Sequence, residues 1–299
     1  MDFKTRQKNE RKLGNGRFLD LSDEDYAKDR GLRRTELLDF DRSEAHFMQG
    51  PYRPKTPDLE FGQDFHLFSL QPDVFEDNYI FLPEDFRGKS LTTNEKIENG
   101  SNIGGVKKAY VEFKKEHQNK KILKAEVKDQ LTSMRTNMLK HDGTNSLFKN
   151  AIAHEATCYH NIVDDLDGKS RIDVDTVAKS GWPILVDIKT TTDASKEAVS
   201  RSVFNYAYFR QAAYYIDSYE KVTGEKVGGF VFVFVEKSKP YNCQPYQMER
   251  EYIEYGKKLN DLSVDSIVKW LRHGTVKPYY DEKIPVVSMP HWVKNEEDR

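Results

Sequence analysis

The residues best suited to chemistry lie in and beside the segment ILVDIKTT, residues 184–191. An apolar run ends there at Asp187 and Lys189, and burying either charge without a partner would be costly. Because residues two apart in a strand point to the same face, these two charged groups project together. Asp173 and Asp175 have the same spacing in the preceding segment. The pattern indicates two strand ends that carry charge on one face.

If these two segments pair as neighbouring strands, three carboxylates and one ammonium converge. Carboxylates at close range repel one another, and one of them takes up a proton unless a cation lies between them. Mg²⁺, which prefers oxygen ligands, would be such a cation. The sequence therefore predicts a magnesium site, although an ordinary ion pair between Asp187 and Lys189 explains the local pattern equally well.

The elements that must position these charges form an orderly run after residue 150. Hydrophobic patterning predicts strands at 155–163, 170–178, 182–189 and 228–237, and helices at 197–222 and 249–273. The apolar strand GGFVFVFVEK is typical of a sheet centre that is covered on both faces. The order of elements predicts an α/β core with a mixed sheet, in which the hairpins are antiparallel and the long helix leads to a parallel strand.

The chain before residue 150 is more polar, with helix-like stretches at 33–48 and 107–140. Residues 88–106 are rich in Gly, Ser, Thr and Asn, which predicts a loop between these stretches. For a chain of 299 residues, we predict an N-terminal helical part, 1–149, and a core, 150–299, within one compact domain overall.

Several short motifs resemble the PD-(D/E)xK nuclease superfamily, in which one strand carries an acid and the next carries D-x-K. The segments RID and VDIKTT match that arrangement, with Ile172 in place of the usual proline. Upstream, FGQDFHLFSL resembles the helix of RecB-type nucleases that brings a histidine to the metal, which places His66 there. Downstream, YFRQAAYY resembles the Q-x-x-x-Y helix motif, with Gln211 and Tyr215 on one helix face. The ordered set is most similar to RecE-type (exonuclease VIII) nucleases of phages and prophages.

The resemblance implies a restriction-endonuclease-like α/β core: a central mixed β-sheet flanked by helices, with an N-terminal helical extension that carries the metal-ligand histidine. It also implies that Mg²⁺, for which Mn²⁺ can substitute, is held by His66, Asp173, Asp187 and the carbonyl of Ile188. Lys189 would then hold the attacking water and the scissile phosphate. The alternative for His66 is a satisfied core histidine.

Further roles follow from the same resemblance. Glu155 would bind a second metal or orient water, or it is a surface residue of its strand. Gln211 and Tyr215 would hold a DNA phosphate or base, or they belong to a polar-edged core helix. Asp175 replaces Asp173 as the first-strand ligand if the strand register is shifted by two residues.

The function implied by the resemblance is that of a metal-dependent exodeoxyribonuclease acting on double-stranded DNA ends. It would digest linear duplexes 5′→3′ and leave 3′ single strands for recombination by annealing, as a homotetramer with a RecT-type annealing protein. Such an enzyme would be encoded by a phage or prophage and work in the bacterial cytoplasm. A structure-specific endonuclease on the same core and a non-catalytic DNA-binding subunit are the alternatives.

Composition excludes some classes of protein. Two cysteines, Cys158 and Cys243, are too few for the four-thiolate iron–sulfur cluster of some related nucleases. No apolar run approaches the roughly 20 residues of a membrane helix, and the N-terminus lacks a secretory signal, so we expect a cytoplasmic protein without membrane contact. The net charge of -2 does not favour nucleic acid, and a local basic groove would have to bind DNA. The basic segment 107–128 is either that groove or a solvated helix face.

Overall fold

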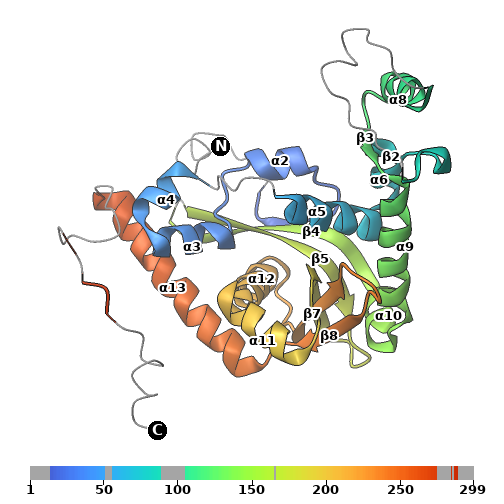
Figure 1. Cartoon of the computed structure of the whole chain (residues 1–299). Helices are drawn as coiled ribbons and strands as arrows, with labels where there is room; N and C mark the ends of the chain where they lie inside the picture. The colour runs from blue at the N-terminus through green and yellow to red at the C-terminus, as the bar shows by residue number, and fades with distance from the viewer. Residues whose placement is uncertain are drawn as a thin grey trace.

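The computed structural model describes residues 14–50, 56–88, 105–164, 166–274, 284 and 286–288. Within these ranges, six strands form a central sheet in the order β1-β4-β5-β6-β7-β8 (Figure 1). β6 and β7 are parallel, and the other neighbouring strands of this sheet are antiparallel. The predicted α/β core with a mixed sheet is therefore confirmed. The strands are β1 (Gly16–Phe18), β4 (Ala151–Val163), β5 (Leu166–Val177), β6 (Pro183–Thr191), β7 (Gly229–Glu236) and β8 (Cys243–Gln247).

Helices cover both faces of this sheet (Figure 1). On one face α12 packs against β4, β5 and β1, with α11, α13 and α3 around it; on the other, α5, α9 and α10 contact the strands. β2 and β3 pair in parallel as a separate small sheet beside α6. The helices and small strands are α2 (Asp23–Lys28), α3 (Arg34–Arg42), α4 (Glu44–Gln49), α5 (Pro57–Leu70), α6 (Pro72–Asn78), β2 (Tyr79–Phe81), η1 (Glu84–Phe86), α8 (Gly105–Glu116), β3 (Lys121–Leu123), α9 (Ala125–Lys140), α10 (Asp142–Lys149), α11 (Lys196–Asn205), α12 (Tyr208–Thr223) and α13 (Arg250–His273).

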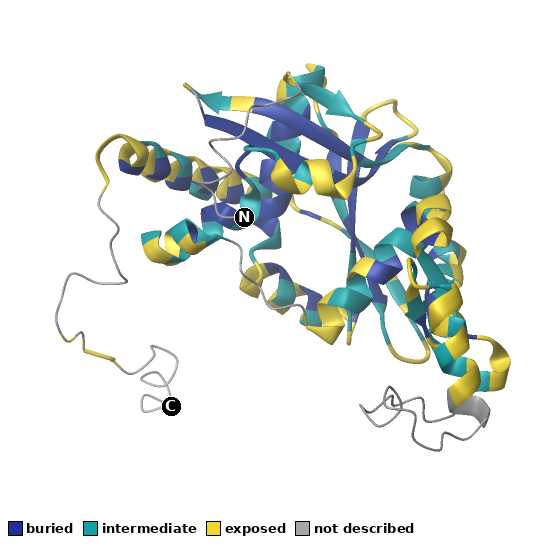
Figure 2. Cartoon of the chain, turned by 90° about the horizontal axis from the view of Figure 1, so that it is seen from above, coloured by how far each residue is buried: buried dark blue, intermediate teal, exposed yellow. Residues whose placement is uncertain are grey.

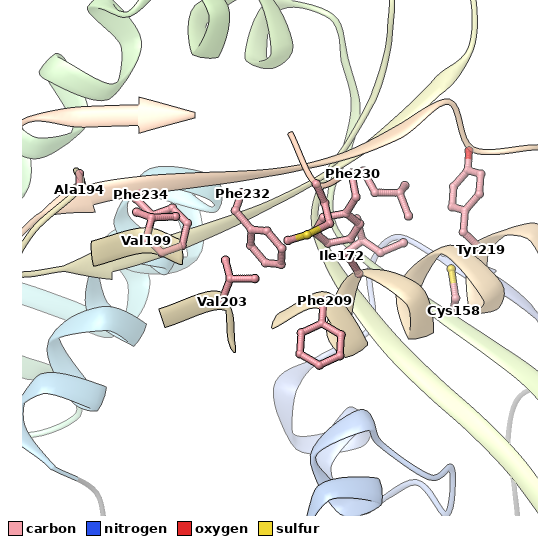
Figure 3. Packing of buried hydrophobic residues seen from close by; sticks show 13 residues of the cluster. Cys158, Ile172, Ala194, Val199, Val203, Phe209, Tyr219, Phe230, Phe232 and Phe234 are labelled. Atoms are coloured by element: carbon pink, nitrogen blue, oxygen red, sulfur yellow. The ribbon is translucent and has the colours of Figure 1, made fainter. Parts of the chain in front are cut away.

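The central strand β7 shows why the sheet is covered on both faces. Its side chains alternate between two apolar clusters, with Phe230, Phe232 and Phe234 on one side and Val233 and Val235 on the other. Figure 3 shows the phenylalanine cluster, in which these rings lie against apolar residues of α11 and α12. Burial is concentrated in the middle strands (Figure 2). Burying each such side chain stabilises the fold by about 1.5–3 kcal/mol.

Element boundaries differ from the prediction in several places. The hairpin of β4 and β5 is longer than predicted, because β4 begins at Ala151 and not at residue 155, and β5 begins at Leu166 and not at residue 170. The predicted helix 197–222 is two helices that break at Tyr206 and Ala207. Ala207 has φ 50°, a left-handed conformation that ends one helix and redirects the next.

The N-terminal part also departs from a purely helical pattern. β1 joins the central sheet, and β3 divides the predicted helix 107–140 into α8 and α9. The predicted helix at 33–48 is α3 followed by α4, with Ser43 between them as the N-cap of α4. Of the predicted loop at 88–106, residues 89–104 lie outside the described residues. The division of the chain at residue 150 stays a prediction.

Candidate active site

The candidate site lies where β5 and β6 stop pairing. Their antiparallel ladder runs from the pair Val177–Pro183 to the pair Val174–Val186. Asp173 is the neighbouring residue of β5, just past the last pair. There the Oδ2 atom of Asp173 accepts a hydrogen bond of 2.7 Å from the Ile188 N–H. The carboxylate thus takes the position that a partner strand would have filled, inside the opening between the two strands.

This opening concentrates negative charge away from water. Asp173 and Asp187 are 8% and 2% exposed. Burial and the repulsion from Asp187 raise the pKa of Asp173 to about 6, although the Ile188 N–H and nearby cationic groups partly oppose the shift. Burial and the charge of Asp173 also raise the pKa of Glu155 well above its usual range. In both cases burial is the first cause and a neighbouring carboxylate the second, and together they favour the protonated form.

His66 reaches this opening from α5. That helix begins at the cap Thr56, whose hydroxyl accepts from the Leu59 N–H, and it packs against β5 and β6. Nε2 of His66 donates to the Ile188 carbonyl oxygen over 2.8 Å. Because the carbonyl can only accept, Nε2 carries the proton, and Nδ1 faces the Oδ2 of Asp173 at 3.4 Å. Two lone-pair atoms so placed need a proton or a metal ion between them.

Glu155 completes this group from β4. Its φ is 53°, a conformation that costs a residue with a side chain roughly 1–3 kcal/mol and that is typical of functional sites. One ligand atom each from His66, Glu155 and Asp173 lies within 4.8 Å of the others. Two atoms that are each about 2.1–2.2 Å from one ion are roughly 3.0–3.6 Å apart, so the His66–Asp173 separation fits a shared ion. The imidazole and carboxylate donors also suit a divalent cation.

Asp187 and Lys189 lie next to this group but engage each other. Oδ2 of Asp187 forms an ion pair with Nζ of Lys189, and Oδ1 accepts a hydrogen bond from Nε2 of Gln211. The ion pair that the local sequence allowed is therefore present. The Ile188 carbonyl faces His66. The metal-ligand roles of Asp187 and Ile188 stay predictions, whereas Glu155 lies in one group with His66 and Asp173.

Lys189 is enclosed by aromatic rings as well as by Asp187. Its Nζ is 5.0 Å from the centre of the Tyr208 ring and 5.8 Å from that of Phe232. Burial disfavours the charged ammonium, but Asp187, Tyr208 and Asp173 outweigh that effect and raise the pKa of Lys189. The side chain is therefore a cation, held over the ring faces that stabilise one.

Arg34 belongs to the site although sequence reasoning did not single it out. Its Nη2 donates to Oε1 of Gln211 over 2.8 Å, so the amide nitrogen of Gln211 must face Asp187. Nη1 donates to the Tyr206 carbonyl oxygen over 3.3 Å. Arg34 is one of many basic residues in a polar segment, and no local spacing marks it, because 177 positions separate it from Gln211.

Two other candidates lie in different surroundings. Asp175 is buried and pairs with Arg17 of β1, whose Nη2 is 2.5 Å from its Oδ2, so the group around His66 contains Asp173 and not Asp175. Tyr215 packs edge to face on Phe230, with ring centres 6.2 Å apart. Its predicted contact with DNA stays a prediction, as does that of Gln211.

Two lysines of the basic segment 107–128 make contacts within the fold. Nζ of Lys121 is 2.6 Å from Oδ1 of Asp64, and Nζ of Lys120 donates to the Glu76 carbonyl oxygen over 2.7 Å. α8 lies at the outer end of the molecule, away from the central sheet (Figure 1). A role for this segment in DNA binding stays a prediction.

None of the helices within the described ranges has both the length and the apolar character needed to span a bilayer.

A forked pair of strands that brings acids and a D-x-K lysine together, with a helix-borne histidine, is the arrangement of the PD-(D/E)xK class. Residues 34–290 match the family described as a PDDEXK-like domain of unknown function (DUF3799), and the chain belongs to that family. The resemblance to the PD-(D/E)xK superfamily is therefore confirmed, while its RecE-type branch stays a prediction.

One solved structure shares this fold over most of its length. A "putative exonuclease" from Eubacterium rectale superposes with a TM-score of 0.54 at 15% identity, covering 93% of this chain and 98% of the other. An alkaline exonuclease from Laribacter hongkongensis gives a TM-score of 0.24 at 10% identity, covering 64% of this chain and 96% of the other. No curated protein matches the sequence.

Proposed function

We propose that this protein is a metal-dependent deoxyribonuclease that hydrolyses phosphodiester bonds. The observation that carries the proposal is the group of His66, Glu155 and Asp173 beside the buried pair of Asp187 and Lys189. The first three residues offer donors to one divalent ion, and the lysine supplies a fixed cation next to them. An ion and an ammonium side by side are suited to the charge of a phosphodiester in hydrolysis.

The residues of the chain would divide the work as follows. His66, Glu155 and Asp173 hold Mg²⁺ or Mn²⁺, and Asp187 and the Ile188 carbonyl complete the set. When bound, the ion would polarise the phosphodiester and lower the pKa of a water molecule. Lys189 would donate to an oxygen of the scissile phosphate or to the attacking water.

Gln211 and Arg34 would act by holding Asp187 in place. Arg34 fixes the orientation of the Gln211 amide, and that amide donates to Oδ1 of Asp187. The other oxygen of Asp187 then remains for Lys189. In this proposal the carboxylate keeps one orientation because both of its oxygens have a defined partner, which keeps the lysine within reach of the ion-binding group.

The finer proposal is an exonuclease that digests linear duplex DNA 5′→3′ and leaves 3′ single strands for annealing. It is supported by the ordered motifs that resemble RecE-type nucleases and by the description of the Eubacterium rectale protein, whose fold this chain shares over most of its length. A homotetramer, a RecT-type partner and work in the bacterial cytoplasm are part of the same proposal.

The test is cleavage of a linear duplex labelled at its 5′ or 3′ end, beside closed circular DNA, with Mg²⁺, Mn²⁺ or EDTA. We expect metal-dependent loss of the 5′ label from the linear duplex and intact circles. The Asp173→Asn variant should be inactive, whereas Asp261→Asn, at an exposed carboxylate of α13, should be active. Cleavage of the circles would indicate an endonuclease instead. Linear DNA left intact under all metal conditions would leave only the non-catalytic DNA-binding subunit.

A further inference from the structure

Two large aromatic side chains lie exposed at the break between α11 and α12. Phe204 and Tyr206 are 65% and 62% exposed. An isolated exposed aromatic residue needs no explanation, but two within three residues expose apolar surface that a binding partner could cover. The break that carries them also adjoins the candidate active site through Tyr208.

Tyr206 continues a column of rings that starts in the core. Its ring stacks on that of Tyr208 with centres 5.6 Å apart and planes at 30°. Tyr208 in turn stacks on Phe232 at 5.4 Å, and its ring centre is 5.0 Å from Nζ of Lys189. The exposed ring is therefore the outer member of a column whose inner members enclose the lysine.

The backbone holds this exposed ring in a defined position. Ala207, the next residue, has φ 50°, which an alanine adopts only when the surrounding structure imposes it. Arg34 donates to the Tyr206 carbonyl oxygen, and the same guanidinium binds Gln211 in the site. The ring is thus fixed relative to the Asp187–Lys189 pair, as a preorganised binding surface requires.

We infer that Tyr206 is a stacking platform for an unpaired base of the DNA strand that is cleaved, next to the phosphate at Lys189. The inference rests on the proposed function and names a part of its substrate. Every base has a π-face, so such a platform binds DNA without reading its sequence. The ring column leads from Tyr206 to Lys189, where the scissile phosphate would lie. A base within one or two nucleotides of that phosphate would therefore come close to Tyr206, which favours a base over other apolar partners.

The test uses Tyr206→Ala and Tyr206→Phe, with Tyr255→Ala as the matched control. Tyr255 is 49% exposed, and its ring stacks at 5.6 Å on Phe209, so it differs from Tyr206 chiefly in its place. Duplexes with a short single-stranded end carry 2-aminopurine or an abasic nucleotide at each successive position. Binding is measured by anisotropy with Ca²⁺ in place of Mg²⁺, and cleavage is measured with Mg²⁺.

We expect Tyr206→Ala to lose about 5- to 100-fold in affinity and to lose the stacking signal of 2-aminopurine, as for one base–aromatic stack. Tyr206→Phe and Tyr255→Ala should bind as the wild type does. One abasic position should weaken the wild type by the same factor and should not weaken Tyr206→Ala further, while kcat at saturating DNA changes little.

Two outcomes would contradict the stacking role of Tyr206 without contradicting the proposed nuclease activity. In one, Tyr206→Ala cleaves DNA and discriminates base from abasic nucleotide as the wild type does. In the other, the substitution dissociates an oligomer, which would show that a second copy of the chain covers the ring. If the wild-type protein cleaves no DNA at all, the proposed nuclease function is wrong, and the stacking role that rests on it is wrong as well.

Discussion

The Asp173 carboxylate accepts a hydrogen bond from the Ile188 N–H, although the strands that carry these residues no longer pair at that point. The opposite edge of β6 continues its ladder with β7 as far as Thr191. A side chain has therefore replaced the backbone of β5 as the acceptor. This exchange lets two strands separate without leaving a buried N–H unsatisfied, and it draws a carboxylate into the opening where an ion can bind.

Replacing Asp173 by Asn should stabilise the metal-free protein while removing metal binding. The pKa of Asp173 is about 6 in the folded protein, above its ordinary value of 3.8, so the folded state binds the proton more tightly than the unfolded state. The free energy of unfolding should fall as pH rises from about 4 to 6 and remain lower above that. At pH 8 the charge would cost up to about 3 kcal/mol, which Asn avoids.

The measurement is thermal unfolding in EDTA at pH 5 and pH 8. Asp173→Asn should melt above the wild type at pH 8 and keep only about half of that advantage in free energy at pH 5. Mg²⁺ added in excess of the EDTA should raise the Tm of the wild type only. A variant that melts below the wild type at pH 8 would show that the carboxylate is stabilising even without an ion.

Replacing Lys189 by Ala should separate catalysis from binding. The lysine contacts Asp187 and aromatic rings, not the group around His66. We expect metal and DNA affinity to persist and single-turnover cleavage to fall about 10²–10⁴-fold. Lys189→Arg should not restore cleavage, because a guanidinium has a different shape and keeps its proton. Near wild-type cleavage by Lys189→Ala would leave the lysine as an ion-pair partner alone.

Replacing His66 by Ala should weaken metal binding at least about tenfold, a loss typical of disturbed metal sites. Excess Mg²⁺ or Mn²⁺ should restore part of the cleavage, because Asp173 and Glu155 remain. Isothermal calorimetry gives the affinity, and cleavage against metal concentration gives the rescue. Replacing His154, whose Nδ1 donates to the Leu70 carbonyl oxygen over 2.9 Å, serves as the control. Unchanged metal affinity would assign His66 to the core.

Replacing Arg34 by Met should lower kcat by roughly tenfold without changing the metal affinity. The loss of a charged hydrogen bond, worth about 1.5–3 kcal/mol, frees the Gln211 amide to turn away from Asp187. The double variant Arg34→Met, Gln211→Leu should therefore be little worse than Gln211→Leu. Strict additivity of the two effects in a double-mutant cycle would show that Arg34 acts elsewhere. Arg33→Met, at the neighbouring arginine, is the matched control.

Removing exposed lysines of α8 should test the predicted basic groove. Lys108, Lys114 and Lys115 are exposed, and they are chosen instead of Lys120 and Lys121 because those two have structural contacts. If the segment binds DNA, each lysine that contacts a phosphate should lower the salt slope of affinity by about 1 when changed to Ala. Anisotropy titrations at several salt concentrations provide the slope, and an unchanged slope would place the groove elsewhere.

The sequence by itself determined the strands of the core and the helix face that carries Gln211. Strand patterns placed Asp173 near Asp187 and Lys189 because side-chain alternation and strand order are local properties of the chain. The apolar strand that became β7 was recognisable for the same reason, since both of its faces are buried. The Q-x-x-x-Y spacing likewise predicted one helix face, and Gln211 does reach Asp187 from it.

Only the tertiary structure decided which side chains of these elements contact one another. Glu155 joins His66 through a left-handed backbone conformation that no strand pattern predicts. Arg34 reaches Gln211 across most of the chain, and the helix break before Tyr208 exposes Tyr206 beside the site. Such contacts follow from how helices and strands pack, and packing depends on many distant residues at once, whereas periodicity depends on near neighbours. For that reason the strands could be predicted from the sequence, and the partners of each buried charge could not.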